Sequence, residues 1–237
     1  MNSRIVVLIP AYNPDEKLVG LIDFLREKFS TIIIVDDGSK EETQSIFAAI
    51  EPKVRKVLKH PENRGKGCAL RTGISWINEN ASDIQGIVTA DADGQHSPSD
   101  IAHIAQVLEE CENALVLGVR TFAKGVPFRS VFGNLWSRFF FRILAGFFVS
   151  DTQTGLRGIP RSMFAQMLEI KGDRYEYELR MLANARCLGR NPIEVPIQTI
   201  YLDNNASSHF RVFRDTWSTQ MALFGVFLKR IFFVRSH

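Results

Sequence analysis

The first half of the chain alternates short apolar runs with segments of helical periodicity, and this alternation limits the possible folds more than any other feature. Five runs, most of them rich in valine and isoleucine, are expected to form strands: 5–9, 31–35, 54–58, 84–90 and 114–119. The segments between them are expected to form helices: 16–29, 42–50, 68–78 and 99–109. Strands that alternate with helices predict an α/β fold, with a mostly parallel sheet flanked by helices.

The second half of the chain has a different character. Residues 128–149 are rich in aromatic residues and arginine, 151–160 are polar and contain glycine, 175–188 have helical periodicity, and 192–201 are expected to form another strand. A length of 237 residues fits one large domain or a domain with an appendage. We expect a domain at 1–205, followed by a basic and aromatic segment at 206–237.

The charge distribution and the cysteines indicate the cellular compartment of the chain and its expected contacts. The three cysteines are far apart and show neither a CxxC pair nor zinc-ligand spacing, so we expect reduced thiols in a cytosolic protein. The basic C-terminal segment is typical of contact with phosphates or with an anionic membrane surface, although a solvated tail has the same composition. The most apolar stretches are interrupted by arginine or lysine, so no transmembrane helix is expected.

An acidic triplet, Asp91-Ala92-Asp93, directly follows the fourth predicted strand. Ligands of parallel sheets bind at the carboxyl ends of the strands. Two carboxylates at such a position can share one Mg²⁺ or Mn²⁺, with Gln95 or His96 as a further ligand. Such a metal would neutralise a diphosphate leaving group as a Lewis acid. Taken alone, the triplet is also typical of a plain turn or helix cap.

Three more polar loops are expected at the same edge of the sheet. Asp36-Asp37 follows the second strand and can accept hydrogen bonds from a base or a ribose, or form a turn that caps the next helix. Pro10-Ala11-Tyr12-Asn13 follows the first strand, where the tyrosine ring could stack on a base. The loop at 63–67 contains Lys66 among glycines and can hold an anion.

Several common site signatures are absent from the sequence. No Walker A loop occurs, no GxGxxG follows the first strand, and neither a GxSxG elbow nor an HExxH pair is present. A nucleotidyltransferase would be expected to carry a glycine-rich basic loop after the first strand, and residues 10–14 do not look like one.

The joint order of the four loops resembles family 2 glycosyltransferases of the Rossmann-like GT-A fold, above all the branch of polyprenyl-phosphate and dolichyl-phosphate sugar synthases. The resemblance continues at 118–120, at Arg129 with Asn134, and at 151–157, 175–178 and 207–210. It implies that residues 1–205 form the catalytic domain. It also implies a nucleotide-sugar donor, UDP- or GDP-linked, and a divalent metal.

The resemblance assigns roles to individual residues. The donor nucleotide would be held by Pro10, Ala11, Tyr12, Asn13, Asp36, Asp37, Lys66, Asp91, Ala92 and Asp93, and the metal by Asp91, Asp93 and Gln95. Arginines matching Arg120 and Arg129 bind the acceptor phosphate in this branch, although each of these two could instead form a surface salt bridge. His209, Arg211 and Arg214 would close over the diphosphate or lie on lipid.

The acceptor determines the expected mechanism. A polyprenyl phosphate oxygen is already anionic and could attack the sugar directly, with inversion, whereas a sugar hydroxyl would need a base, for which Glu178 is preferred over Glu176. Glu178 could also be a structural helix residue. A third reading is a nucleotide-sugar-binding subunit that does not catalyse transfer.

The membrane is the last expected partner. Residues 135–144 and 221–234 read as amphipathic helices that face a membrane, although the first could also be a core helix. We therefore expect an enzyme peripheral to the cytoplasmic face of a membrane, with or without a membrane-anchored partner subunit, and no nucleic acid partner.

Overall fold

The computed structural model describes residues 4–111, 113–120, 142 and 148–198. Within them the strands are β1 (Ile5–Ala11), β2 (Ile32–Asp36), β3 (Lys56–Lys59), β4 (Gly86–Thr89), β5 (Val116–Arg120), β6 (Arg157–Pro160) and β7 (Ile193–Ile197). The helices are α1 (Lys17–Leu25), α2 (Gln44–Ile50), α3 (Lys66–Asn80), α4 (Pro98–Glu110), α6 (Phe164–Glu169) and α7 (Glu176–Cys187). Short 3-10 turns cover Glu41–Thr43, Glu51–Lys53 and Arg161–Met163.

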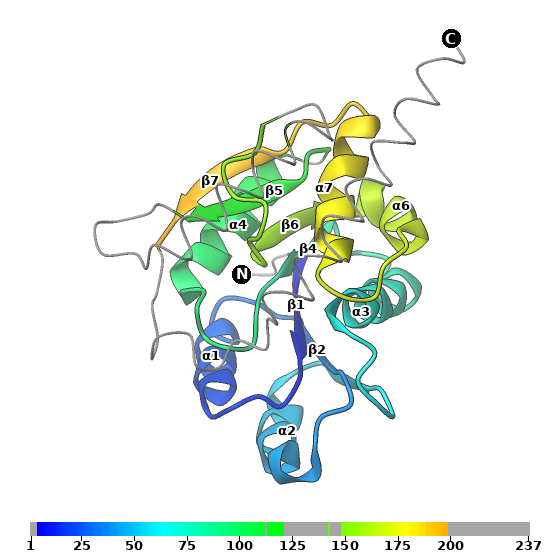
Figure 1. Cartoon of the computed structure of the whole chain (residues 1–237). Coiled ribbons are helices and arrows are strands. Elements are labelled where there is room, and N and C mark those ends of the chain that lie inside the picture. The colour runs from blue at the N-terminus through cyan, green and yellow to red at the C-terminus, as the bar shows by residue number, and fades with distance from the viewer. Residues whose placement is uncertain (1–3, 112, 121–141, 143–147, 199–237) are drawn as a thin grey trace, which may run out of the picture.

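The strands form one mixed sheet in the order β3-β2-β1-β4-β6-β5-β7 (Figure 1). Among the described strands only β6 runs antiparallel to its neighbours, β4 and β5. The register pairs Thr89 with Arg157 and Gly86 with Pro160. Every strand expected from the sequence forms, which confirms the mostly parallel α/β fold.

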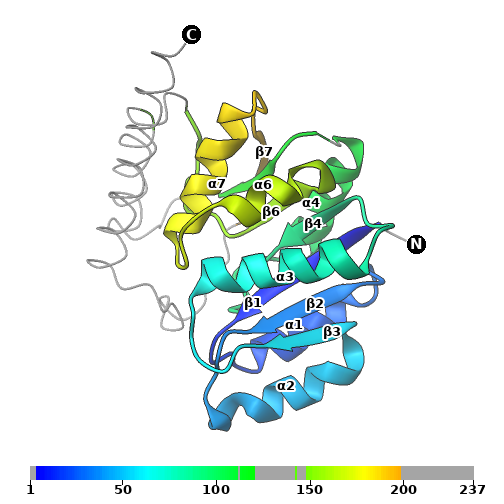
Figure 2. The same ribbon diagram turned by 90° about the vertical axis from the view of Figure 1, so that its right-hand side faces the viewer.

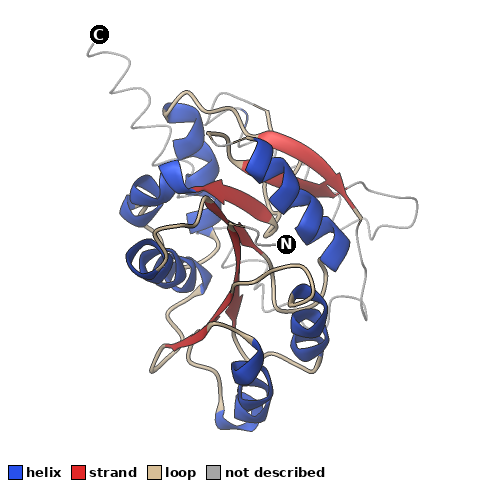
Figure 3. Ribbon diagram, turned by 180° about the vertical axis from the view of Figure 1, so that it is seen from behind, coloured by secondary structure: helices blue, strands red, loops and turns tan. Residues whose placement is uncertain are grey.

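Two apolar layers cover the sheet, as expected for strands buried on both faces. Successive residues of β1 point to opposite layers: Val6 and Leu8 pack with α3, α6 and α7, whereas Ile5 and Val7 pack with α1, α2 and α4. Figure 2 shows α3 and α6 across one face, and Figure 3 shows the molecule from behind, with the strands lying between helices. Because β1, β2 and β4 run parallel between these layers, the polar loops that follow them lie at one edge of the sheet.

Strand β6 and helix α6 were not expected from the sequence. Strand β6 is only four residues long and reads Arg-Gly-Ile-Pro, so it lacks the β-branched run that predicts a strand. Helix α6 has only six residues, too few for a periodic pattern. Because β6 is antiparallel, the loop that precedes it, rather than the loop that follows it, lies at the carboxyl edge of the other strands.

Several expectations concern residues outside the described part of the chain. These are the amphipathic helices at 135–144 (of which only Arg142 is described) and 221–234, the end of the last strand beyond Gln198, and the boundary between 205 and 206. Among the helices that are described, none combines the length and the apolar character needed to cross a membrane.

Candidate active site

The loops that follow β1 and β2 are hydrogen-bonded to each other. The Asn13 amide donates to Ser39 Oγ at 2.9 Å, and the Lys40 amide donates to Asn13 Oδ1 at 2.8 Å. The Asp37 amide also donates to the carbonyl of Ala11 at 2.8 Å. Asn13 has a φ of 48°, a left-handed conformation that asparagine tolerates better than most residues. The two expected donor loops therefore form one connected surface at the carboxyl edge of the sheet.

Asp37 is buried, and its carboxylate organises the loop before α3. Oδ1 lies 2.7 Å from His60 Nδ1 and accepts the Arg64 amide at 2.9 Å, while Oδ2 accepts the Gly65 amide at 2.8 Å. His60 Nε2 in turn lies 3.0 Å from Thr72 Oγ1 on α3. Asp37 thus holds the beginning of α3 against the end of β2, and its contact with a base stays a prediction.

The neighbouring acid, Asp36, is also buried and turned towards its own loop. Its Oδ1 accepts the Ser39 amide at 2.9 Å, and its Oδ2 lies 3.4 Å from the side-chain nitrogen of Gln44. This is the turn and helix start that the sequence offered as the alternative to a nucleotide contact. Pro10 and Tyr12 are partly exposed beside this turn, where a nucleotide could reach them.

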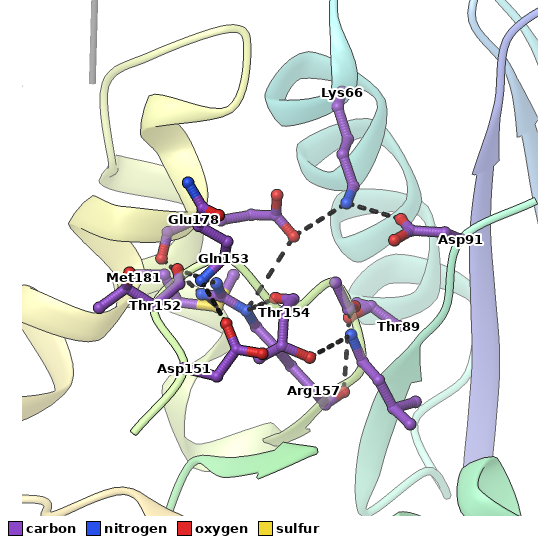
Figure 4. Close-up of polar contacts among 12 residues, drawn as sticks. Lys66, Thr89, Asp91, Asp151, Thr152, Gln153, Thr154, Arg157, Glu178 and Met181 are labelled. Atoms are coloured by element: carbon purple, nitrogen blue, oxygen red, sulfur yellow. Dashed lines mark hydrogen bonds and ion pairs between the residues drawn. The ribbon is translucent and has the colours of Figure 1, made fainter. Parts of the chain in front are cut away.

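Lys66 is the first residue of α3, and its side chain extends between two carboxylates (Figure 4). Its Nζ lies 2.6 Å from Asp91 Oδ1 and 3.0 Å from Glu178 Oε1. Gly65 before it has a φ of 96°, which a side chain would not tolerate. Burial acts to lower the pKa of Lys66, but Asp91 and Glu178 outweigh burial and raise that pKa above its ordinary value. The ammonium therefore stays charged at neutral pH.

The acidic triplet follows β4 and carries two carboxylates in different environments. Burial acts to raise the pKa of Asp91, but Lys66 and then His96 hold that pKa below its ordinary range. For Asp93, burial and then the negative charge of Asp91 raise the pKa, while its Oδ1 accepts the Gln95 amide at 3.0 Å. Two acids that repel each other form a site at which bound positive charge is stabilising.

This donor set fits a divalent cation that is completed by substrate. Asp91 and Asp93 provide carboxylate oxygens and Gln95 an amide, which are the ligands that Mg²⁺ and Mn²⁺ prefer. Within the residues that the structure describes, no three or more His, Cys, Asp or Glu side chains are grouped to hold a metal ion. The remaining positions would therefore come from water and from phosphate oxygens. His96 lies 3.2 Å from Asp91 through Nε2, and its buried Nδ1 has no hydrogen-bond partner.

The loop that precedes β6 lies directly against the triplet. Thr89 Oγ1 donates to the carbonyl of Gly155 at 2.8 Å. A Cβ atom on Gly155 would lie only 2.3 Å from Asp91 Oδ2, so this approach requires glycine. The antiparallel direction of β6 thereby brings a segment from the second half of the chain to the acids that follow β4.

A fully buried arginine, Arg157, holds this loop to α7 (Figure 4). Its guanidinium donates to the carbonyls of Thr154 at 2.9 Å, Thr152 at 3.4 Å and Glu178 at 2.5 Å. Its Nε lies 4.0 Å from Glu178 Oε1. Glu178 is therefore fixed between Lys66 and Arg157 rather than turned towards solvent.

Arg120 ends β5 and pairs with an acid from the same loop. Its Nε and Nη2 donate to the two oxygens of Asp151 at 2.6 and 3.0 Å, and the Asp151 carboxylate is fully buried. This is the salt bridge that the sequence left open for Arg120, and its contact with an acceptor stays a prediction. The other expected phosphate-binding residues, Arg129, His209, Arg211 and Arg214, lie outside the described residues.

Comparison with known proteins places this geometry in a family. The sequence profile of glycosyl transferase family 2 matches residues 6–167, which include the triplet, Lys66 and the 151–157 loop. The chain belongs to glycosyltransferase family 2. It is a glycosyltransferase, and in sequence it falls with the dolichyl-phosphate sugar synthase branch, as the order of its motifs predicted.

Individual relatives place the glycosyltransferase more narrowly. It is 34% identical over 222 residues to UDP-N-acetylglucosamine–dolichyl-phosphate N-acetylglucosaminyltransferase of Methanococcus voltae, a match that covers 85% of this chain and 88% of the relative. It is 27% identical over 234 residues to dolichyl-phosphate beta-glucosyltransferase of Dictyostelium discoideum, covering 88% and 70%.

A solved structure shows the same GT-A fold. Glucosyl-3-phosphoglycerate synthase from Mycobacterium tuberculosis, in complex with Mn²⁺, UDP and phosphoglyceric acid, matches with a TM-score of 0.68 at 18% identity. The match covers 95% of this chain and 78% of that chain. At this identity the similarity concerns the fold.

Two features of the glycosyltransferase site were not recognised from the sequence alone. Nothing in the sequence assigned the contacts of Arg157, because a buried arginine at the first position of a short strand carries no local signal. His60 lies outside the motifs, and only its contact with Asp37 in the folded chain reveals its place. The Asp-Thr-Gln-Thr-Gly sequence at 151–155 was a usable signal, since polar residues with glycine often mark a functional loop.

Proposed function

We propose that this glycosyltransferase moves a hexose or N-acetylhexosamine from a UDP- or GDP-linked donor to a polyprenyl phosphate, either dolichyl or undecaprenyl phosphate. The relatives named for transfer to dolichyl phosphate support this acceptor class. The solved relative that carries Mn²⁺ and UDP supports a nucleoside diphosphate donor and a divalent metal. The reaction inverts the anomeric configuration, because the acceptor oxygen attacks opposite the leaving diphosphate.

The observation that carries this proposal is the environment of Glu178. A general base must contact the acceptor hydroxyl at about 2.6–3.2 Å and be free to take its proton. Glu178 is instead buried, with Oε1 3.0 Å from Lys66 Nζ and 4.0 Å from Arg157 Nε. A carboxylate between two cations serves as their counter-ion. An acceptor that needs no base, such as a phosphate monoester, agrees with this arrangement.

Each residue at the carboxyl edge then has a task in the transfer. Asp91, Asp93 and Gln95 would hold the divalent cation, which when bound supplies Lewis-acid neutralisation of the leaving diphosphate. Lys66 places a second positive charge beside the same group. The connected loops after β1 and β2 hold the nucleoside, with Pro10, Ala11, Tyr12 and Asn13 on one side and Asp36 and Asp37 on the other.

The acceptor side is assigned to cations in the second half of the chain. Arg129, His209, Arg211 and Arg214 bind the acceptor phosphate and close over the donor diphosphate, since a guanidinium fork matches a phosphate group. Arg120 contributes from the end of β5, where Asp151 orients it. In this proposal 1–205 is the catalytic domain and 206–237 is the closing segment that touches lipid headgroups.

The proposed acceptor places the enzyme at a membrane surface. A polyprenyl chain stays in the bilayer, so the enzyme must reach a phosphate at the headgroup level. The aromatic and arginine-rich sequence at 135–144 and the basic C-terminal segment suit such contact. We assign the cytoplasmic face, where nucleotide sugars are made, with contact that is direct or helped by a membrane-anchored partner.

The test offers a panel of donors to the purified full chain. UDP-N-acetylglucosamine, UDP-glucose and GDP-mannose are each incubated with dolichyl or undecaprenyl phosphate and Mn²⁺ or Mg²⁺, and lipid products are followed by mass spectrometry. We expect a glycosyl phosphate lipid with at least one donor, and no product when EDTA is present. A matched alkyl glucoside supplies a hydroxyl acceptor. Product on the glucoside alone, lost in Glu178→Gln, would support the hydroxyl-acceptor alternative instead.

A further inference from the structure

Both oxygens of the Asp91 carboxylate are already engaged. Oδ1 lies 2.6 Å from Lys66 Nζ, and Oδ2 lies 3.2 Å from His96 Nε2. The backbone of Gly155 lies against the same carboxylate, since a Cβ there would lie 2.3 Å from Oδ2 and 2.7 Å from Oδ1. The Lys66 ammonium therefore occupies an approach to Oδ1 that a bound cation would also need, and the two positive charges would repel each other there.

Lys66 has a second anchor that would hold it after such a move. Its Nζ is 3.0 Å from Glu178 Oε1, and the Glu178 side chain is 7% exposed, against 29% for Asp91. Lysine carries a point charge on a flexible stem, so it can leave one carboxylate and keep the other. Arg157 fixes Glu178 from the far side, which keeps this anchor in place.

The charges around the site explain why the exchange depends on a ligand. Three carboxylates, those of Asp91, Asp93 and Glu178, face the cations Lys66 and Arg157. While Lys66 neutralises Asp91, a divalent cation meets mainly the negative charge of Asp93. A nucleoside diphosphate brings additional negative charge, which attracts the Lys66 ammonium and releases Asp91.

We propose that Lys66 is an exchangeable counter-ion of Asp91, which prevents the free enzyme from binding a divalent cation until a nucleoside diphosphate is present. The donor and the cation then enter the site together. This inference rests on the proposed function only in requiring a metal-dependent diphosphate donor site. It concerns the order of binding and says nothing of the acceptor.

The test measures the affinity for Mn²⁺ directly rather than through activity. The electron paramagnetic resonance signal of free Mn²⁺ gives its dissociation constant for the full chain, with and without saturating UDP, after the Mn²⁺ bound by UDP in protein-free samples is subtracted. The ratio of the two constants reports the coupling between cation and diphosphate. For the wild type we expect binding without UDP to be at least tenfold weaker than binding with UDP.

Two neutral variants remove the counter-ion in different ways. In Lys66→Met and Lys66→Gln, Mn²⁺ binding without UDP is expected to become about tenfold tighter, which is the size expected when one unit charge leaves a partly screened site. The coupling ratio falls accordingly. The glutamine variant keeps a polar amide at this position and covers the case in which the methionine variant does not fold. Lys66→Arg keeps the charge and is expected to keep the ratio at more than half its wild-type value.

A matched control is Lys53→Met, since Lys53 also pairs with an aspartate, Asp23 at 2.7 Å, but at the opposite edge of the sheet. Its coupling ratio is expected to equal that of the wild type. A wild type that binds Mn²⁺ equally well with and without UDP, or folded Lys66 variants with an unchanged ratio, would overturn the inference. If metal-dependent transfer to polyprenyl phosphate is present in that case, the proposed function survives. If the wild type couples Mn²⁺ to UDP through Lys66 but transfers no sugar to any phosphate lipid, the proposed function fails instead.

Discussion

The two sides of the site are built in different ways. On the donor side, the loops after β1, β2 and β4 leave parallel strands at one edge, and their contacts, such as the Asn13 pair with Ser39 and Lys40, are mostly between neighbouring loops. On the opposite side, the 151–156 loop leads into an antiparallel strand, and Arg157 donates hydrogen bonds to the carbonyls of this loop. The ends of parallel strands position the donor-side residues, whereas a buried arginine holds the loop on the opposite side.

This difference predicts that one side of the site serves mainly catalysis and the other mainly the stability of the fold. The donor side has carboxylates at positions where strand ends expose them, so substitutions there should affect catalysis more than folding. The opposite side has its key charge buried among backbone carbonyls, so substitutions there should affect folding first and catalysis as a consequence. Variants on each side, measured for both stability and transfer rate, test this contrast.

The largest effect is expected for Asp93→Ala on the donor side. Loss of a metal-binding carboxylate removes several kcal/mol of charge stabilisation, so the rate of metal-dependent transfer should fall by about a thousandfold, with little change in stability. The rate is measured with saturating donor and the thermal midpoint by calorimetry. Asp83→Ala, at an exposed site before β4, serves as the control. An Asp93→Ala enzyme with more than a tenth of wild-type activity would remove Asp93 from the metal site.

Arg157→Met should show the reverse pattern. Loss of the buried guanidinium leaves the carbonyls of Thr152, Thr154 and Glu178 without their donor, and we expect the free energy of unfolding to fall by about 3 kcal/mol. Urea unfolding followed by circular dichroism measures this loss. Arg161→Met is the control, because Arg161 also donates to a carbonyl, that of Ala81 at 2.8 Å, from a partly exposed position. Equal losses in both variants would show that burial is not the cause.

Gly155→Ala tests the contact between the two sides. The added methyl group meets Asp91 at 2.3 Å, so either the loop or the carboxylate must shift, at a cost of about 2 kcal/mol. We expect part of this cost to appear as weaker binding of Mn²⁺ with UDP, measured by titration calorimetry. Gly20→Ala in α1, where the methyl group meets nothing within 4 Å, should stabilise the protein. Unchanged Mn²⁺ affinity in Gly155→Ala would mean that the two sides are not mechanically coupled.

The smallest effect is expected for Ser97→Ala, which alters a purely local contact. Ser97 caps α4 by accepting the Asp100 amide at 3.0 Å, and loss of a cap costs about 1 kcal/mol. Calorimetry should detect a lower thermal midpoint. A loss as large as that of Arg157→Met would contradict the view that long-range contacts dominate the stability of the site.

The same division explains what could be predicted from the sequence. The strand–helix alternation and the Ser97-Pro98 helix start are local signals, and both appear in the structure. The strand-end loops were predicted to meet, and the contacts of Asn13 with Ser39 and of Lys66 with Asp91 confirm it. The contacts of Arg157 and the pairing of His60 with Asp37 join residues that are distant along the chain, so no local pattern encodes them.

The pairing of Thr89 with Arg157 in the sheet has a consequence for alignment. The acidic triplet leaves β4 at this pair, and the 151–156 loop enters β6 at the same pair, so the ladder between the two strands sets how far apart their loops stand. A slip of one residue would displace one loop against the other by about 3.3 Å and turn the Arg157 side chain to the other face of the sheet. The register of hydrogen bonds between β4 and β6 thus determines how the two halves of the site are aligned.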